Sequence, residues 1–128
     1  MEIFSEIFGQ LYGAIIDNLS IDLLKKTINF ELTVCEGIKK SNYSLNFDAY
    51  DSILWLEKDR YMSSDYDIKK CDYFELTAIT SNNINLYTKN NWLQQFDIGF
   101  NIAIEIWESV LLIKTDKLYI NGREYIIK

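Results

Sequence analysis

Carboxylates are the residue type in this chain with the most capacity for chemistry. The chain has 128 residues, of which 19 are Asp or Glu. Three pairs of acids are closely spaced: Asp48 with Asp51, Asp65 with Asp67, and Glu105 with Glu108. Paired acids are typical of general acid–base catalysis, as in glycoside hydrolysis. Nothing in the sequence predicts that two of them meet in a cleft, so we interpret them as solvated surface charge.

Other residue types narrow the chemistry further. There is no His, which excludes a Ser-His or Cys-His relay and an imidazole metal site. The two Cys are too few for an all-cysteine zinc site. Asp65 and Asp67 resemble the start of a calcium loop, but the Gly at the sixth position and the Glu at the twelfth are missing. The sequence therefore predicts no catalytic, cofactor-binding or metal-binding residues and no enzyme activity.

Charge and composition bear on partners and location. The 13 Lys and Arg against 19 acids give a net charge of −6, and Arg occurs only at Arg60 and Arg123, which argues against nucleic-acid binding. Glu2 and Glu6 stand where a signal peptide needs positive charge, and the longest aliphatic run is too short to cross a membrane. We expect a cytoplasmic protein whose Cys35 and Cys71 are free thiols, buried or half-buried.

The elements that must position these residues begin with a short helix. Apolar residues recur there at helical spacing: Ile3, Phe4, Ile7, Phe8 and Leu11. Gly9 and Gly13 predict that the helix ends between them. Such a short helix is stable only if its apolar face packs against the rest of the molecule.

Strands follow, because the hydrophobic period changes to two. Alternation predicts strands over 19–23, 28–35, 43–47, 73–80 and 84–88. The segment 53–56 is apolar on both faces, which we interpret as a central strand. Residues 96–107 fit a strand or a helix, and the run of Ile at period two favours the strand. Asn121-Gly122 between two short apolar segments predicts a type I′ hairpin over 117–126.

Together these elements predict the fold class α+β, mostly β. We expect about eight strands in a curved antiparallel sheet, a roll, half-barrel or sandwich, with one short N-terminal helix against it. No shift in composition marks a boundary, so residues 1–128 are expected to form a single domain.

The middle third of the chain is the candidate partner-binding region. It is rich in aromatic residues: Tyr43, Phe47, Tyr50, Trp55, Tyr61, Tyr66, Tyr73 and Phe74. Residues 48–75 hold eight acids and four bases, so −4 of the net charge lies there. An acidic, aromatic surface suits a basic protein partner. We expect the contacts to come from Tyr50, Asp59, Tyr61, Asp65, Tyr66 and Asp67. The alternative is a solvated loop over a core into which the aromatic rings point.

Three stretches carry a resemblance to known proteins. They are "YGAIIDNLSIDLLKKTINFEL" (12–32), "SLNFDAYDSILWLE" (44–57) and "NIAIEIWESVLLIKTDKLYINGREYII" (101–127). Their order resembles the YxiG-like group of small uncharacterised bacterial proteins and, more distantly, the β-rich immunity proteins of polymorphic toxin systems. The resemblance covers nearly the whole chain and brings no catalytic residue with it. It implies a protein that binds and neutralises a secreted toxin, as in a toxin–antitoxin pair.

Three hypotheses about function follow. The first is a non-catalytic protein-binding domain, an immunity-type inhibitor of a bacterial toxin. The second is a small-molecule-binding protein or enzyme that uses the concave face of the sheet, which requires a deep pocket with convergent polar groups. The third is a structural homodimer, formed through a strand edge or the aromatic patch.

Overall fold

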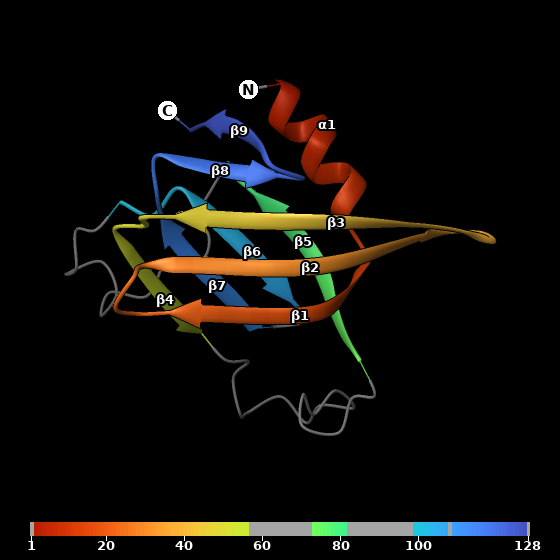
Figure 1. Ribbon diagram of the computed structural model, residues 1–128, viewed down its shortest axis with the longest axis horizontal. Helices are drawn as coiled ribbons and strands as arrows, with labels where there is room; N and C mark the ends of the chain where they lie inside the picture. Colours follow the sequence, from red (N-terminus) through yellow and green to blue (C-terminus); the bar gives the residue numbers. More distant parts are fainter. Residues whose placement is uncertain (1, 57–72, 82–98, 108, 128) are drawn as a thin grey trace.

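The protein forms one curved antiparallel sheet with a helix at one end (Figure 1). The computed structural model describes residues 2–56, 73–81, 99–107 and 109–127. The elements are α1 (Glu2–Leu11), β1 (Ala14–Asp22), β2 (Thr27–Glu36), β3 (Lys39–Asp48), β4 (Ser52–Leu56), β5 (Phe74–Thr80), β6 (Ile102–Ile106), β7 (Ser109–Lys114), β8 (Lys117–Ile120) and β9 (Arg123–Ile126). The described part of the chain thus contains one helix and a nine-stranded sheet.

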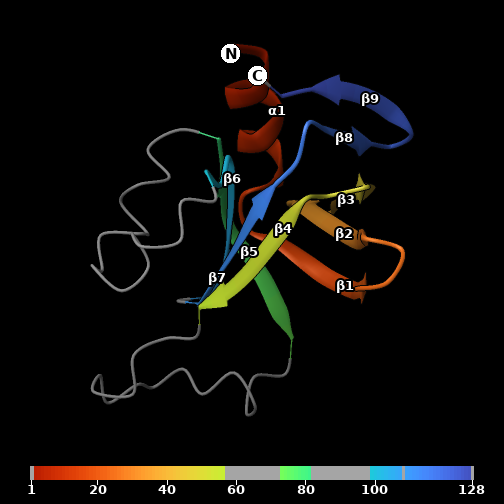
Figure 2. The same ribbon diagram turned by 90° about the vertical axis from the view of Figure 1, so that its left-hand side faces the viewer.

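The strands follow the order β4-β7-β6-β5-β1-β2-β3-β8-β9, and every neighbouring pair is antiparallel. The sheet bends back on itself, so that β1, β2, β3 and β8 lie in front of β4, β5, β6 and β7 (Figures 1 and 2). A mostly β protein with a curved antiparallel sheet and one short helix is therefore confirmed.

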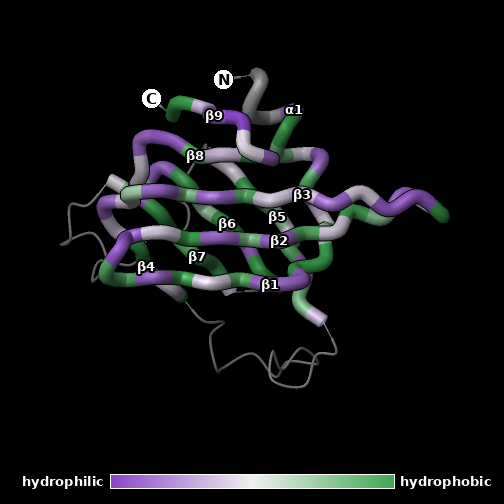
Figure 3. Tube along the Cα trace, viewed as in Figure 1, coloured by the Kyte–Doolittle hydropathy of each residue, from purple (hydrophilic) through white to green (hydrophobic). Residues whose placement is uncertain are grey.

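The hydrophobic core fills the inside of this curve. Along β2, Ile28, Phe30 and Leu32 are buried, while Asn29 and Glu31 point to the outer face (Figure 3 shows the alternation). β7 differs, because its residues Ser109–Ile113 are buried without alternation. A continuous apolar run of this kind is typical of a strand that is covered on both faces. The longest aliphatic run of the chain, 110–113, lies in this strand, but the alternation in the sequence did not predict a strand there.

The helix packs over one end of the curve (Figure 2). Its residues Phe8 and Leu11 are buried in the core, and the Tyr12 hydroxyl donates a hydrogen bond to the Ile79 carbonyl at 3.3 Å. The helix stops at Leu11, and Gly13 has a φ of 79°, which glycine adopts without strain. The predicted helix end between Gly9 and Gly13 is confirmed. In the described residues no helix has the length and apolar character needed to cross a membrane.

The central position predicted for 53–56 is wrong, because β4 comes at the end of the order of the described strands. Its two apolar faces have another cause. Ile53 packs on the main core, whereas Leu54 and Leu56 pack with Phe100 on a second cluster formed by Ala103, Val110 and Leu112. An edge strand that separates two clusters shows the same pattern as a central strand.

Two further predictions, the strand at 96–107 and the burial of Cys35 and Cys71, can be compared with the structure over part of their residues. Ile102–Ile106 is a strand, as favoured, while 99–101 lies outside any element. Cys35 is exposed on the outer face of β2 and not buried. Residues 96–98, the strand predicted at 84–88, and Cys71 lie outside the described residues.

The Asn-Gly hairpin is confirmed, with Asn121 at a φ of 52° and Gly122 at 82° between β8 and β9.

We expect Gly122→Ala to lower the free energy of unfolding by about 1–2 kcal/mol, because alanine is strained at positive φ. Gly9→Ala is the matched control: Gly9 lies inside α1 with open space around its Cα, so alanine should stabilise by about 0.5–1 kcal/mol. Urea unfolding of both variants checks the opposite signs, and equal signs would contradict this account of the turn.

A candidate binding groove beside strand β1

Strand β1 changes its role halfway along. Ala14, Ile15 and Ile16 pair with β5 on one side and the strand pairs with β2 on the other. The register then shifts between Ile16 and Asn18, which places a bulge at Asp17. From Asn18 to Asp22, β1 pairs with β2 alone among the described strands. Among the described strands, β1 thus has neighbours on both sides before the bulge at Asp17 and on one side after it.

An apolar groove of about 430 Å³ opens beside this edge. It is lined by residues of four strands, Ile16, Asp17, Asn18, Leu19, Trp55, Phe74 and Ile106. Leu19 and Ile21 point to the inner side of β1, because they lie opposite the buried Phe30 and Ile28 of β2. The groove is thus a continuation of the core that the curved sheet does not close.

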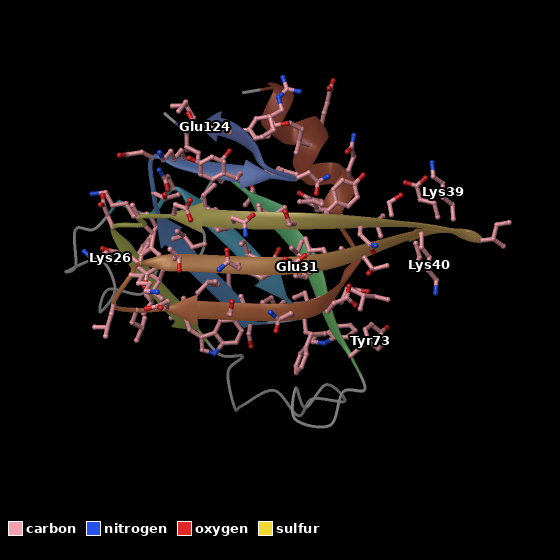
Figure 4. The ribbon with its side chains drawn as sticks, viewed as in Figure 1. Lys26, Glu31, Lys39, Lys40, Tyr73 and Glu124 are labelled. Atoms are coloured by element: carbon pink, nitrogen blue, oxygen red, sulfur yellow. The ribbon has the colours of Figure 1, made fainter. Side chains whose placement is uncertain are left out.

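Two aromatic side chains are half-exposed at the groove. Trp55 of β4 is 40% exposed and Phe74 of β5 is 42% exposed. The ring of Tyr73, next to Phe74, lies 5.5 Å from that of Trp107 and is also exposed (Figure 4). Large rigid aromatic groups of this kind are typical anchors of protein interfaces.

A second, wider hollow of about 610 Å³ follows further along β1. Its lining runs from Ser20 to Lys25, with Thr27 and Asn29 of β2. The turn here is fixed, because the Asp22 carboxylate accepts hydrogen bonds from the backbone N–H groups of Leu24 and Lys25 at 3.0 and 2.9 Å. Leu23 and Leu24 are left exposed at its tip. Concave surface therefore accompanies β1 from the bulge to the turn.

The arrangement of charged side chains in the described residues bears on metal binding and on acid–base chemistry. No group of three or more Cys, Asp or Glu in the described ranges is placed to hold a metal ion. Lys117 lies 4.0 Å from the Glu124 carboxylate and 5.7 Å from the ring centre of Tyr119. The neighbouring Tyr119 hydroxyl, by its hydrogen bond, and the Glu124 carboxylate, by its charge, raise the pKa of Lys117. A lysine shifted in this direction stays protonated at neutral pH, which does not suit a base or a nucleophile.

Of the six predicted contact residues, the structure describes only Tyr50. Tyr50 is only 5% exposed and packs in the core, so its ring does not reach the surface as the sequence analysis expected. A backbone hydrogen bond fixes Tyr50 to the β1–β2 turn, because its N–H donates to the Lys26 carbonyl at 3.1 Å. Asp59, Tyr61, Asp65, Tyr66 and Asp67 lie outside the described residues.

The aromatic region itself divides into two groups. Phe47 and Tyr50 are buried and Tyr43 is half-buried, whereas Trp55, Tyr73 and Phe74 are exposed. The exposed group flanks the acidic segment 57–72 on both sides in the sequence. Composition predicted a binding region here, but which of its aromatic rings are exposed depends on strand positions that composition does not show. Leu19 and Asp17 were not predicted as groove residues, because no local pattern in the sequence marks the bulge.

Comparison with known proteins places the chain in a family. No curated protein and no solved structure shows significant similarity to it. Residues 4–125 match the family described as YxiG-like protein, a description that names no activity. That match spans nearly all of the chain, including every described strand apart from Ile126. The chain belongs to the YxiG-like protein family.

Proposed function

We propose that this protein is a non-catalytic binding protein that holds another protein in the groove beside β1. The observation that carries the proposal is the groove itself, an apolar hollow with Trp55 and Phe74 half-exposed at its wall. Side chains of this type are unfavourable in water unless a partner covers them, and their rigidity lowers the entropy lost on binding.

The partner we propose is a bacterial toxin with a basic domain, which the protein meets and neutralises in the cytoplasm. The net charge of −6 supports this choice, because opposite charge speeds encounter and disfavours acidic competitors. The resemblance to β-rich immunity proteins agrees with it. Inhibition by such a protein needs only that the complex covers the toxin's own site, so no catalytic residue is required of this chain.

The test is co-expression with the toxic domain encoded by the adjacent gene. We expect the wild-type chain to restore growth and the Trp55→Ala/Phe74→Ala double variant to lose this protection. Ile38→Ala serves as the control, because Ile38 is also apolar and is fully exposed, but lies on the β2–β3 turn. Failure of the wild-type chain to restore growth, at levels where it is folded and abundant, would contradict the toxin partner.

A small molecule is the second candidate occupant of the groove. About 430 Å³ lies within the range of small-ligand pockets, and Asp17 and Asn18 add polar groups to an apolar lining. Native mass spectrometry of the protein purified from its own cell separates the two functions. A bound organic molecule that Trp55→Ala releases would favour this alternative, whereas a bound protein supports the first.

A further inference from the structure

We infer that the occupant of the groove is an extended segment of the partner, with alternating apolar and basic side chains, which pairs with β1 as an added strand. This inference rests on the proposed function and specifies how the partner is held. It is carried by three features of β1: the edge of residues 18–22, with which no other described strand than β2 pairs, the two different sides of that edge, and its charges.

The edge supplies the backbone groups that an added strand needs. Among the described residues, no strand pairs with Asn18–Asp22 on the side away from β2. In Figure 1 this part of β1 forms the lower border of the front layer. An edge of this kind presents N–H and C=O groups that a strand of another protein can pair with. Five residues of strand cover about 15 Å, which suits an extended segment better than a compact ligand.

The two sides of the edge differ in chemistry. Leu19 and Ile21 both point to the inner side: Leu19 lines the groove, where Trp55 and Phe74 add apolar surface, and Ile21 lines the wider hollow that follows it. Asn18, Ser20 and Asp22 point outward, opposite the outer-face residues of β2. A strand that pairs with β1 places successive side chains alternately inward and outward, so apolar residues must alternate with polar ones.

The charges select basic residues for the outward positions. Asp17 and Asp22 are both exposed, and no Lys or Arg lies on β1. Each carboxylate is fixed by hydrogen bonds, Asp17 by the Thr33 hydroxyl and Asp22 by the backbone of the turn. Opposite charges on neighbouring strands attract, so Lys or Arg across from these acids is favoured.

The same charges argue against a second copy of this chain as the occupant. Antiparallel pairing of two β1 edges would place Asp17 of one copy near Asp22 of the other. Like charges in facing positions destabilise a strand pair, and charged edges with bulges are a common protection against self-association. The edge is therefore selective for a partner of opposite charge.

The experiment uses the full chain and synthetic peptides of about ten residues. One set alternates Val, Leu or Phe with Lys or Arg, and a matched set carries Glu in place of the basic residues. Fluorescence anisotropy should find binders in the basic set and none in the acidic set. If no basic peptide binds at about 1 mM, or if acidic peptides bind as well, the inference is wrong.

N-methylation of alternate amides tests the strand pairing itself, because successive N–H groups of an extended peptide point to opposite sides. We expect methylation of one set of alternate amides to weaken binding at least about tenfold and methylation of the other set to leave it nearly unchanged. Equal effects of the two sets would overturn strand addition even if a peptide binds.

Charge variants complete the test. Asp17→Asn/Asp22→Asn keeps both hydrogen-bond acceptors and should weaken the basic peptides about five- to tenfold at low salt. Glu36→Gln/Glu124→Gln removes the same charge from the β2–β3 hairpin and from β9, away from the edge of β1, and should change little (Glu124 is labelled in Figure 4). Equal losses in both variants would overturn the role of the edge acids. If the wild-type chain protects cells against the toxin as proposed but no peptide binds, the binding function stands and only the proposed mode of binding is wrong.

Discussion

Phe30→Ala is expected to lower the free energy of unfolding by about 3–5 kcal/mol, the largest effect on stability that we predict. Phe30 lies in the middle of β2, is fully buried, and has Leu19 of β1 and Leu45 of β3 directly opposite it. Alanine removes the ring and leaves a cavity that the strands on either side prevent from collapsing. Domains of this size are stable by only about 5–15 kcal/mol, so the loss is a large fraction of the total.

Thermal and urea unfolding measure this loss. A midpoint lower by roughly 10–20 °C is expected for Phe30→Ala. Ile38→Ala removes a side chain of similar character that is fully exposed, and should stay within about 0.5 kcal/mol of wild type. If Phe30→Ala unfolds with the wild-type midpoint, the two layers do not enclose the core described above.

Trp55→Ala is expected to weaken the complex with the partner protein by at least about 30-fold, equivalent to about 2 kcal/mol. The indole lies on the inner side of β4, as Ile53 does, and faces the groove across from β1. Its exposed part is the surface that a partner would cover. Its buried part also supports the fold, so we expect a smaller loss of about 1–2 kcal/mol in unfolding free energy.

Two companion variants separate binding from folding. Trp55→Phe keeps an aromatic ring at the groove and should retain most of the stability and part of the affinity. Phe74→Ala removes the other aromatic ring from β5 and should weaken the complex in the same direction. If Trp55→Ala and Ile38→Ala bind the partner equally well, the groove is not the binding site.

Local patterns in the sequence were sufficient for most of the fold. The alternation in β2 and β3, the apolar face of α1 and the Asn-Gly turn each depend on residues close in sequence, and each is confirmed. The order of strands depends on pairings between distant segments. For that reason β4 was predicted as central, although its second apolar face covers Ala103, Val110 and Leu112.

The candidate site was harder to predict for the same reason. Clustering of aromatic residues in the middle third predicted a binding region there, but Tyr50 and Trp55, five residues apart, have opposite environments. Their difference arises because the chain crosses from one layer to the other between β3 and β4. The bulge at Asp17, which exposes the edge of β1, results from pairing with both β2 and β5 and has no local sequence signal.

The central claim is tested most directly by isothermal titration of the toxic domain that the proposal expects to be encoded beside this chain's gene. It is titrated into the wild-type chain and into Trp55→Ala. The account predicts a one-to-one complex with the wild-type chain and an affinity lower by at least about 30-fold for the variant. Circular dichroism must show that the variant is folded at the temperature of the titration. A folded variant that binds as tightly as wild type, or a wild-type chain that binds no toxic domain, would contradict the account.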